Sequence, residues 1–389
     1  MDIIFLTHPS FLNSQSMPRF ANYLAAGMQA RGHHVEQWTT SPFIYKFAFH
    51  NSLKKWFGYI DQYLLFPYTI KKRLKACSSD TLLVLTDQAL GPWLPTLAKK
   101  PHVVHCHDFL AQHSALGRIP ENPTSWTGRV YQAFIRRGYT QGKHFISVSQ
   151  TTQENLHAFL STPPTTSAVV YNGLNPIFAP HSQEEARALW SQATSLQLTA
   201  GYLLHVGGNQ WYKNRIGCIE LYNAWRSQES HNLPLLLVGE PPSEAILRQY
   251  ESSAFKKDIH FLSGFDDDMI RLAYAGATVF LFPSLAEGFG WPIAEAMAAG
   301  CLVVTTQEAP MTEVGGTASF YIPRRPSDQL ATEWAAAAAE TIQQVVALTP
   351  VQRQKAVDAG LKNAQRFSAA AALDAIEAIY KQCLQPQHV

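Results

Sequence analysis

The chain has 389 residues, of which 46% are hydrophobic and 15% charged, with a formal net charge of +2. This length exceeds what one hydrophobic core usually supports and predicts two domains or slightly more. So small a net charge excludes the usual argument for a nucleic-acid partner. The five cysteines stand singly, so they indicate neither a zinc site nor a disulfide framework, and a reducing, cytoplasmic setting fits best. No signal peptide or membrane-spanning run is expected, so any membrane contact would be peripheral.

Apolar runs of strand length alternate with amphipathic helical stretches, a pattern typical of doubly wound parallel sheets. The first series contains a helix around residues 19–31 and strands at 2–7, 34–36, 82–85, 102–105, 144–148 and 168–170. The second series contains strands at 202–206, 235–238, 259–261, 279–282 and 302–305. Between the two series, residues 171–195 hold Asn-Gly, Asn-Pro and Ala-Pro pairs, which predict a linker.

These series predict an α/β fold with two Rossmann-like, doubly wound domains. We place the first domain at residues 1–178 and the second at residues 179–368. A C-terminal helix over 369–384 is long enough to cross back, so residues 369–389 are expected to complete the first domain. Open parallel sheets bind ligands at their carboxyl edges, which predicts a functional site in a cleft that the two domains face.

The most informative stretch runs from Glu287 to Glu295 and reads Glu-Gly-Phe-Gly-Trp-Pro-Ile-Ala-Glu. It follows an apolar strand, Pro292 suits the start of a helix, and Gly300 supplies the helix stop. Backbone N–H groups at the start of such a helix, with the positive end of its dipole, favour an anion. One carboxylate in the turn and one in the helix can then address different parts of a sugar nucleotide.

A second glycine-bearing loop follows the strand at 202–206 and contains Gly207, Gly208 and Lys213. Glycines let the backbone approach a ligand, and the lysine supplies positive charge. A Gly-Gly turn beside a surface lysine is also a common structural feature. Its place in the domain that carries Glu287 and Glu295 favours the ligand-binding interpretation.

The motifs resemble those of the retaining, metal-independent glycosyltransferases with the GT-B fold, called family 4 or glycosyl transferases group 1. The resemblance covers almost the whole chain. It is carried by the following stretches: Val206-Gly207 through Lys213-Asn214, Pro283-Ser284, Glu287-Gly288-Phe289-Gly290 and Glu295. Supporting marks are Arg31-Gly32-His33, His107-Asp108, Ser147-Val148-Ser149 and Tyr171-Asn172-Gly173.

The resemblance implies that the second domain binds a nucleotide-diphosphate sugar and the first an acceptor. Glu287 would bind hydroxyls of the donor sugar, Glu295 the ribose, and Lys213 the diphosphate, whose growing charge it offsets. Further implied donor contacts are Gly207, Gly208, Asn209, Phe289, Gly290 and Trp291. Relatives usually carry an arginine shortly before the lysine; here Arg215 is the possible substitute. The nucleotide base is expected near residues 260–265.

The same resemblance implies that His107 contacts the donor sugar near the reacting carbon. No enzymic nucleophile is expected, because the departing phosphate oxygen takes the proton of an acceptor that attacks from the same face. A structural role is the ordinary alternative in a chain with 15 histidines. The match at His107-Asp108 favours the sugar contact.

Two further groups of residues allow more than one interpretation. His8 and Arg19 flank a loop after the first strand and suit either acceptor or phosphate contacts or simple capping. The run from Asp266 to Asp268 could suggest a metal site, but it precedes a helical stretch and better fits an N-cap with an acidic first turn. No metal site and no cofactor are expected.

Residues 45–75 mix aromatic and basic side chains, with Asp61 as the only acid. Such a segment suits docking on an anionic membrane surface, at the inner face of the cell membrane. Packing of the aromatic side chains into a core, with a solvated basic face, is an equal alternative.

Together these features predict a retaining glycosyltransferase, a hexosyltransferase by resemblance, that uses a saccharide or lipid-linked saccharide acceptor in bacterial cell-surface polysaccharide or lipopolysaccharide synthesis. Two alternatives stay open. A nucleotide-sugar epimerase shares the architecture, although the turn between Glu287 and Glu295 favours transfer. A catalytically silent sugar-nucleotide-binding partner of an assembly complex is the other, against which the intact Lys213 and His107 argue.

Overall fold

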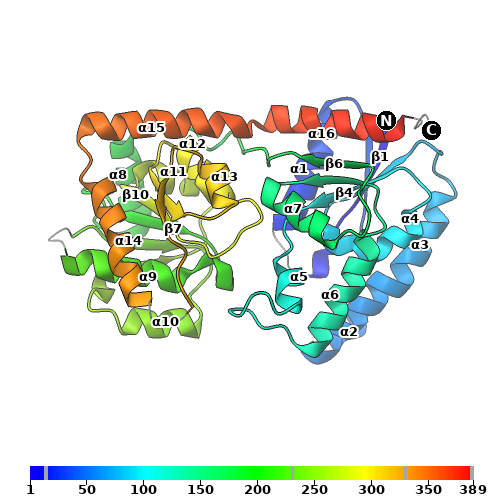
Figure 1. Cartoon of the computed structure of the whole chain (residues 1–389), viewed down its shortest axis with the longest axis horizontal. Coiled ribbons are helices and arrows are strands. Elements are labelled where there is room, and N and C mark those ends of the chain that lie inside the picture. Colours follow the sequence, from blue (N-terminus) through cyan, green and yellow to red (C-terminus); the bar gives the residue numbers. More distant parts are fainter. Residues whose placement is uncertain (13–15, 229–231, 328–330, 386–389) are drawn as a thin grey trace. The chain divides into compact units, whose positions relative to one another are not determined.

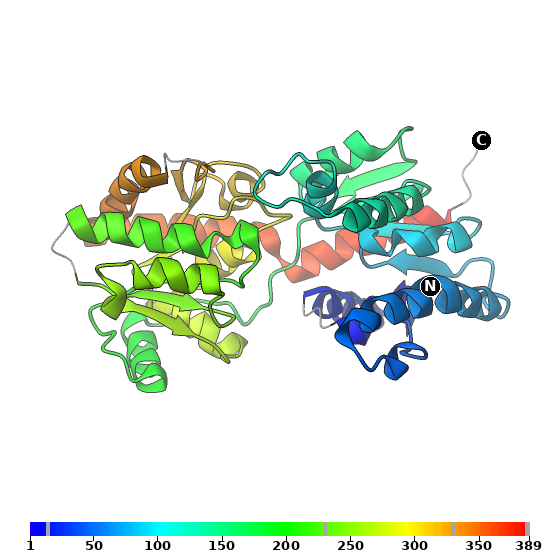
Figure 2. The same cartoon turned by 90° about the horizontal axis from the view of Figure 1, so that it is seen from below.

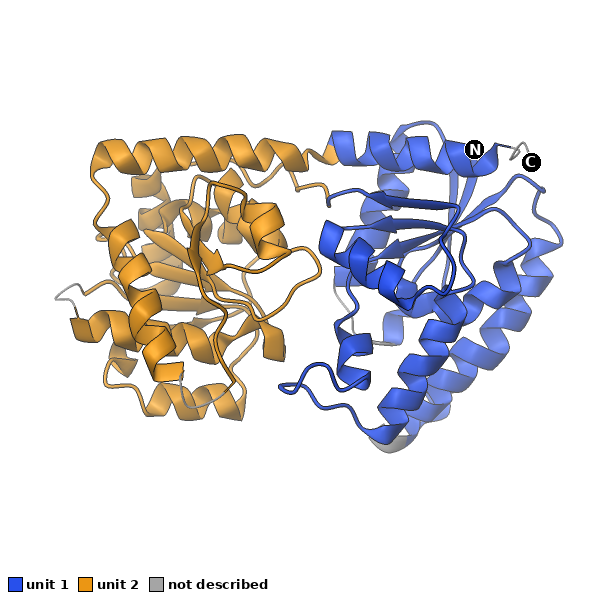
Figure 3. Cartoon of the chain, in the orientation of Figure 1, with its two compact units in different colours: residues 1–171, 370–389 blue, residues 172–369 orange. Residues whose placement is uncertain are grey.

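The computed structural model describes residues 1–12, 16–228, 232–327 and 331–385, which divide into two compact units (Figures 1 and 3). Unit 1 comprises residues 1–171 and 370–389, and unit 2 comprises residues 172–369. The first division thus lies before Asn172, where the sequence predicted residue 178. The intervening residues pack within unit 2: the Leu174 N–H donates to the Phe367 carbonyl oxygen at 2.8 Å, and the Phe178 ring lies 6.0 Å from that of Tyr274.

Unit 1 contains a six-stranded sheet in the order β2-β1-β3-β4-β5-β6, with every pair parallel. Its strands are β1 Asp2–Leu6, β2 His34–Trp38, β3 Leu82–Leu85, β4 His102–Cys106, β5 His144–Ser147 and β6 Thr166–Val169. Its helices are α1 Ser16–Ala30, α2 Asn51–Ile60, α3 Phe66–Leu74, α4 Leu94–Leu97, α5 Leu110–Ala115, α6 Trp126–Tyr139, α7 Gln150–Phe159 and α16 Ala369–Leu384. A π-helical turn at Asp61–Leu65 joins α2 to α3.

The strands of unit 1 are apolar on both faces because helices cover both faces. Ile3 and Phe5 of β1 point to one side, into a core shared with α1 and α16. Ile4 and Leu6 point to the other side, into a core shared with α3, α6 and α7. The central strands β3 and β4 are fully buried, so the sequence shows them as continuous apolar runs.

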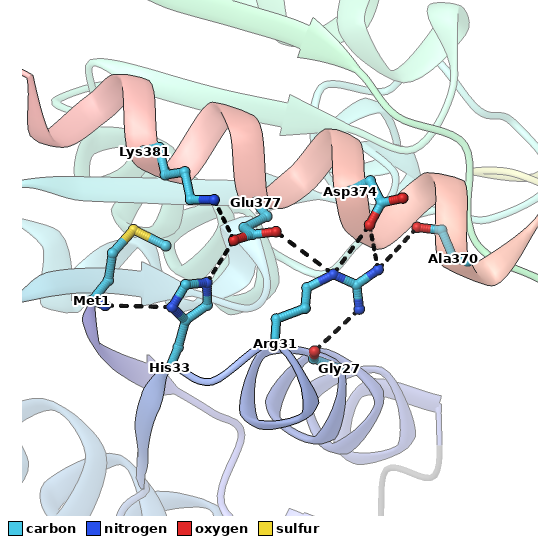
Figure 4. Close-up of polar contacts among 8 residues, drawn as sticks. All are labelled: Met1, Gly27, Arg31, His33, Ala370, Asp374, Glu377 and Lys381. Atoms are coloured by element: carbon cyan, nitrogen blue, oxygen red, sulfur yellow. Dashed lines mark hydrogen bonds and ion pairs between the residues drawn. The ribbon is translucent and has the colours of Figure 1, made fainter.

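The C-terminal helix α16 is held on unit 1 by a cluster of ion pairs (Figure 4). Arg31 donates to the Asp374 carboxylate, and His33 Nε2 donates to Glu377 Oε1 at 2.8 Å. Lys381 also pairs with Glu377. Hydrogen bonds from Lys381 and His33 hold the pKa of Glu377 below its ordinary value. The Arg31-Gly32-His33 motif therefore contributes to the attachment of α16.

Unit 2 contains a second six-stranded parallel sheet, in the order β12-β11-β10-β7-β8-β9. Its strands are β7 Leu203–Val206, β8 Leu235–Val238, β9 Ile259–Leu262, β10 Val279–Phe282, β11 Val303–Thr306 and β12 Phe320–Ile322. Its helices lie on both faces (Figures 1 and 2) and are α8 Gln183–Thr194, α9 Arg215–Gln228, α10 Glu244–Glu251, α11 Asp267–Gly276, α12 Trp291–Ala298, α13 Met311–Gly315, α14 Ala331–Val346 and α15 Pro350–Ala364.

The predicted linker at 171–195 is wrong in its second half, where the chain forms α8. Ser182 caps this helix by accepting the Glu185 N–H, and the buried Trp190 side chain anchors it through a bond to the Met269 carbonyl oxygen. The turn-forming pairs end before Ser182, so the linker pattern covered only the approach to the helix. The sequence prediction also missed β12, whose three residues are too few to show a period.

The acidic run before α11 is confirmed as a cap. The Asp266 carboxylate accepts the Met269 N–H, and Asp267 and Asp268 occupy the first turn. Nowhere in the described part of the chain do three His, Cys, Asp or Glu side chains gather as metal ligands would.

Some aromatic side chains of residues 45–75 pack into the core, whereas others are exposed as a membrane-docking surface would require. Phe66 is buried and packs against Trp93, with ring centroids 4.6 Å apart, whereas Phe49 and Trp56 are 90% and 57% exposed. Asp61 is buried and accepts the backbone N–H groups of Ile44 and Tyr45. Across the residues that the structure describes, no helix is both long and apolar enough to span a membrane.

Candidate functional site

The loops after β7 and β8 form the centre of the candidate site in unit 2. The Gly207 N–H donates to the Val238 carbonyl oxygen at 2.9 Å. Gly239 has φ +146°, and a Cβ atom there would lie 2.1 Å from the Gly207 carbonyl oxygen. The two loops therefore approach so closely that position 239 requires glycine.

Asn214 ties the loop after β7 to the end of β10. It has φ +52° and ends a 3₁₀ turn at Trp211–Lys213. Its side-chain amide donates to the Pro283 carbonyl oxygen at 2.8 Å, and its Oδ1 accepts the Gly217 N–H at the start of α9. Lys213 is thereby held next to the chain that leads to Glu287.

Lys213 and Glu287, 74 residues apart in the chain, form an ion pair with Nζ and Oε1 2.8 Å apart. Their side chains are 15% and 8% exposed, so the pair is largely shielded from water. The Lys213 ammonium also lies 5.0 Å from the centroid of the Phe282 ring. The structure thus brings together the two residues to which the resemblance gives sugar and diphosphate contacts.

Arg215 is only 2% exposed and has no carboxylate in contact among the described residues. Its NH1 donates to Asn209 Oδ1 at 2.6 Å and to the Glu240 carbonyl oxygen at 2.8 Å. Its Nε and NH2 find no partner in the described part of the chain. Burial lowers the pKa of this guanidinium. Unpaired buried donors are costly, so Arg215 is suited to an acceptor that the protein itself does not supply.

His205, on β7 beneath this loop, is a buried residue to which the sequence assigned no role. Its Nδ1 donates to the Leu281 carbonyl oxygen at 2.9 Å, which leaves Nε2 as an acceptor. Nε2 has no partner among the described residues and lies 3.0 Å from where a Cβ on Gly207 would stand. Burial lowers the pKa of His205 to about 3, so the ring is neutral.

The remaining predicted donor residues lie around α12. Gly290 precedes the helix with φ +96°, and Trp291 and Pro292 form its first turn. Phe289 packs edge-on against Phe367, with centroids 5.5 Å apart. Glu295 is buried in the helix, where its Oε2 accepts the Tyr274 hydroxyl at 3.2 Å. Glu295 thus has a protein partner besides the ribose that the resemblance implies.

The region expected to hold the nucleotide base begins at β9. Its Phe261 ring lies 5.5 Å from the Arg215 guanidinium carbon. The segment 260–265 is therefore adjacent to the arginine, and Gly208 adjoins the same loop next to Asn209.

Unit 1 has a polar cluster at the carboxyl edge of its own sheet, built around Asp87. The carboxylate accepts from His8 Nε2 at 2.9 Å and from the Ala89 N–H at 2.8 Å. Burial alone would raise the pKa of Asp87, but the hydrogen bond and charge of His8 outweigh it and lower the pKa. His8 is therefore engaged by a carboxylate that the sequence did not single out.

His107 lies beside this cluster, after β4. Its backbone N–H donates to Gln88 Oε1 at 2.9 Å, and its Nε2 donates to the Thr86 carbonyl oxygen at 2.9 Å. Phe20 contacts the ring edge-on, with centroids 4.5 Å apart. Burial lowers the pKa of His107, although Asp87 opposes this. Because Nε2 donates, Nδ1 of the neutral ring is an acceptor.

Sequence reasoning missed Thr86, Asp87 and Gln88, although a signal was present. They directly follow the apolar strand β3, and β3 pairs with β4, which His107 directly follows. Carboxyl ends of neighbouring parallel strands lie at one edge, so the two groups had to meet. Arg19, in contrast, is an exposed residue of α1, and part of the loop before it, residues 13–15, lies outside the described residues.

Comparison with known proteins agrees with both units. Residues 17–177 match the model of Glycosyltransferase Family 4, and residues 200–344 match that of Glycosyl transferases group 1. The chain is 31% identical over 122 residues to the O-antigen chain mannosyltransferase B of Escherichia coli, covering 31% of this chain and 32% of that protein. It is 25% identical over 209 residues to the O-antigen chain mannosyltransferase RfbU of Salmonella typhimurium, covering 53% and 54% respectively. The chain thus spans a third to about half of the length of these two relatives.

Solved structures share the fold. Sucrose-phosphate synthase from Thermosynechococcus elongatus superposes with a TM-score of 0.72 at 18% identity, over 98% of this chain and 99% of that one. Anabaena Alr3699/HepE, solved in complex with UDP-glucose, gives 0.69 at 18% identity, over 98% and 100%. The two family models adjoin along the chain, and each sheet is of the doubly wound parallel type. The chain therefore belongs to the GT-B glycosyltransferases that combine a family 4 domain with a group 1 domain.

Proposed function

We propose that this protein transfers a sugar, a hexose in the first instance, from a nucleotide-diphosphate donor to a saccharide acceptor with retention of configuration. The observation that carries the proposal is the set of unsatisfied polar atoms in unit 2. Arg215 Nε and NH2 lack acceptors among the described residues, and Lys213, two residues earlier in the same loop, is paired with Glu287. A diphosphate supplies the acceptors that Arg215 lacks.

Lys213 and Glu287 change partners in the reaction that we propose. The glutamate accepts hydrogen bonds from the donor sugar's hydroxyls, and Lys213 turns to the diphosphate, whose negative charge grows as the bond to the sugar breaks. The acceptor hydroxyl forms the new bond on the same face, and its proton passes to the departing phosphate oxygen. Glu295 holds the ribose, and His107 offers Nδ1 to a hydroxyl of the sugar. No metal is assigned to this step.

The acceptor that we propose is a lipid-linked saccharide of O-antigen or lipopolysaccharide synthesis at the inner face of the cell membrane. Two relatives named as O-antigen chain mannosyltransferases support this setting, and mannose is accordingly the first donor sugar to try. A cytoplasmic location remains a prediction.

Analysis of the products formed from nucleotide sugars separates the three candidate activities. The protein is incubated with UDP-, GDP- and ADP-sugars, with and without a lipid-linked saccharide, and released nucleotide, new glycoside and epimerised sugar are measured. A transferase forms glycoside, an epimerase changes the sugar without a glycoside, and a silent partner binds a donor without turnover. The absence of a glycosidic product with every donor would contradict the proposal, and the anomeric configuration of any product tests retention.

We also propose that unit 1 contacts the membrane through a surface formed by residues 43–75 and 126–137, here called the aromatic-basic surface. Helices α2 and α6 pack together in it, because the Tyr59 and Tyr131 rings stack 5.0 Å apart. Trp126, the first residue of α6, is 75% exposed. Its exposed apolar side chains are Phe43, Phe47, Phe49, Leu53, Trp56, Leu64, Leu65, Tyr68, Trp126, Val130 and Phe134.

The charge of the aromatic-basic surface favours an anionic lipid layer. Its basic residues are Lys46, Lys54, Lys55, Lys71, Lys72, Arg73, Lys75, Arg129, Arg136 and Arg137, and its one acid, Asp61, is buried as a backbone acceptor. Such residues contribute about 1 kcal/mol each near an anionic membrane. Co-sedimentation with vesicles of phosphatidylglycerol and phosphatidylcholine tests this contact. We expect binding that falls with salt and with Trp56→Ser/Phe49→Ser; equal binding to pure phosphatidylcholine would contradict it.

A further inference from the structure

Unit 2 contains a polar cavity at the opposite edge of its sheet from Lys213. The cavity has a volume of about 580 Å³ and is lined by Gln183, Arg187, Ala200, Asn232, Leu233, Thr278, Val346 and Arg353. Ala200, Leu233 and Thr278 come just before β7, β8 and β10, whereas Gly207, Glu240 and Pro283 follow these strands. Strands of four residues separate the two edges by roughly 13 Å. The cavity is therefore not part of the candidate donor site.

Two guanidinium groups face this cavity without a carboxylate partner among the described residues. Arg187 donates to the carbonyl oxygens of Gly276 (2.8 Å) and Thr199 (3.4 Å) and to the Thr278 hydroxyl (3.3 Å). Arg353 donates to the carbonyl oxygens of Thr278 and Val345, each at 2.9 Å. Each guanidinium carries five N–H donors, so both keep donors for a ligand.

Part of this positive charge is offset by the protein, and part is not. Gly276 and Val345 lie in the last turns of α11 and α14, whose carboxyl ends each carry roughly half a negative charge. Two such ends offset about half of two guanidinium charges, and the cavity lining contains no acid. Burial lowers the pKa of both arginines, and the charge of Arg353 lowers that of Arg187 further. An anion in the cavity would relieve this repulsion.

From this geometry we propose that the Arg187–Arg353 cavity binds a small phosphorylated molecule, at a site separate from the donor site. The volume lies within the range of about 300–1,000 Å³ typical of small-molecule sites. Arginine pairs suit phosphate because the planar guanidinium donates two parallel hydrogen bonds to it. Gln183 and Asn232 at the rim add amide groups for neutral parts of the ligand.

The cavity lies next to residues that precede two strands, and these strands lead to the donor loops. A Cβ on Gly201 would lie 2.2 Å from Thr278 Oγ1 and 2.8 Å from Arg187 NH2, so the arginine sits directly against the residues that begin β7 and β10. The same two strands end at Val206 and at Phe282, from which the chain leads to Glu287. A ligand that draws the arginines together acts on the starts of both strands. The inference itself concerns binding and does not rest on the proposed transfer reaction.

Titration calorimetry with inorganic pyrophosphate tests the proposal on the full chain. Lys213→Gln with Arg215→Met is used as the background, so that both proposed diphosphate contacts of the donor site are removed. We expect saturable binding in that background, weakened at least tenfold by Arg187→Gln with Arg353→Gln. The matched control is Arg248→Gln, which removes an exposed arginine paired with Glu244 and should leave binding unchanged. No binding in the background, or binding unaffected by the paired change, overturns the proposal.

A second measurement covers the case in which the paired variant fails to fold. Phenylglyoxal labels accessible arginines, and peptide mass spectrometry locates the label in the same background variant with and without pyrophosphate. Protection of Arg187 and Arg353, with Arg248 labelled equally in both samples, supports the site. Equal labelling of the pair with and without pyrophosphate overturns it.

Discussion

Both sheets are six-stranded and parallel, but the polar groups at their carboxyl edges are paired differently. In unit 1, His8 pairs with Asp87, and His107 donates through both its ring and its backbone N–H. In unit 2, Arg215 Nε and NH2 lack acceptors among the described residues, and Lys213 forms an ion pair with Glu287. The Asp87 cluster of unit 1 is thus paired within the protein, although the Thr40 and Ser147 hydroxyls at the same edge lack partners among the described residues. In unit 2 we propose that a ligand supplies the missing acceptors.

This difference teaches how each edge can contribute to one reaction. A satisfied network holds its side chains in fixed orientations, which suits positioning of a neutral sugar or acceptor. A network with buried unpaired cations stores an unfavourable energy that an anionic donor relieves on binding. Substitutions in unit 2 should therefore affect catalysis more than folding, and those in unit 1 should affect folding as well.

The largest effect is expected from Lys213→Ala, which removes the cation that stabilises the leaving diphosphate. We expect kcat/KM for transfer to fall about 100- to 1,000-fold, equivalent to about 2.7–4 kcal/mol. Glu287→Ala should produce a loss of similar size by removing the sugar contact. Rates of nucleotide-diphosphate release measure both, with exposed Lys256→Ala as the control for loss of a lysine. A near-normal rate in either variant would remove that residue from the mechanism.

Arg215→Met distinguishes a ligand-binding arginine from a structural one. If the unpaired nitrogens bind the diphosphate, KM for the donor should rise. The free-energy equivalent of this rise should be about 1.5–3 kcal/mol, the contribution of a hydrogen bond to a charged group. Thermal stability should change little, because the substitution also removes an uncompensated buried charge. A lowered Tm with an unchanged KM would show instead that Arg215 serves the fold through Asn209 and Glu240.

Asp87→Asn tests whether the hydrogen bonds of the Asp87 cluster stabilise unit 1. The folded-state pKa of Asp87 is lowered, so its carboxylate stabilises the fold above the unfolded value of about 3.9 and loses this effect as pH falls further. We expect the variant to be less stable by about 1–3 kcal/mol at pH 7. Urea unfolding at several pH values should show that the difference in unfolding free energy between the variant and the wild type shrinks below a pH of about 3.9. A difference that is the same at every pH would contradict the assignment.

The smallest effect is expected from the cluster of ion pairs that holds α16 on unit 1. Glu377→Gln removes a partly solvated acceptor of His33 and Lys381, so its cost should be only about 0.2–1 kcal/mol. The difference in unfolding free energy from the wild type should shrink in high salt, which screens such pairs. A loss of several kcal/mol in unfolding free energy would mean that these ion pairs, rather than Tyr380 and its apolar neighbours, hold the helix.

Much of the fold and of the candidate site could be predicted where apolar periodicity or a short motif carries the signal. The strands at 82–85, 235–238 and 279–282 and the helix at 369–384 have the predicted bounds. Helix α8 was missed because turn-forming pairs just before it dominated the interpretation. Asp87 was missed because a single acid after a strand carries no pattern until its partner strand is known.

By itself, the sequence determined the fold class, the family and the identities of Lys213 and Glu287, because apolar periodicity and glycine-rich turns are local properties of the chain. Only the tertiary structure decided that these two form an ion pair. It also decided that Arg215 is buried with two nitrogens unpaired among the described residues, and that Arg187 and Arg353 line one cavity. Such contacts join residues far apart in the chain. Their distances and burial depend on how strands pair and loops close, which no single stretch of sequence specifies.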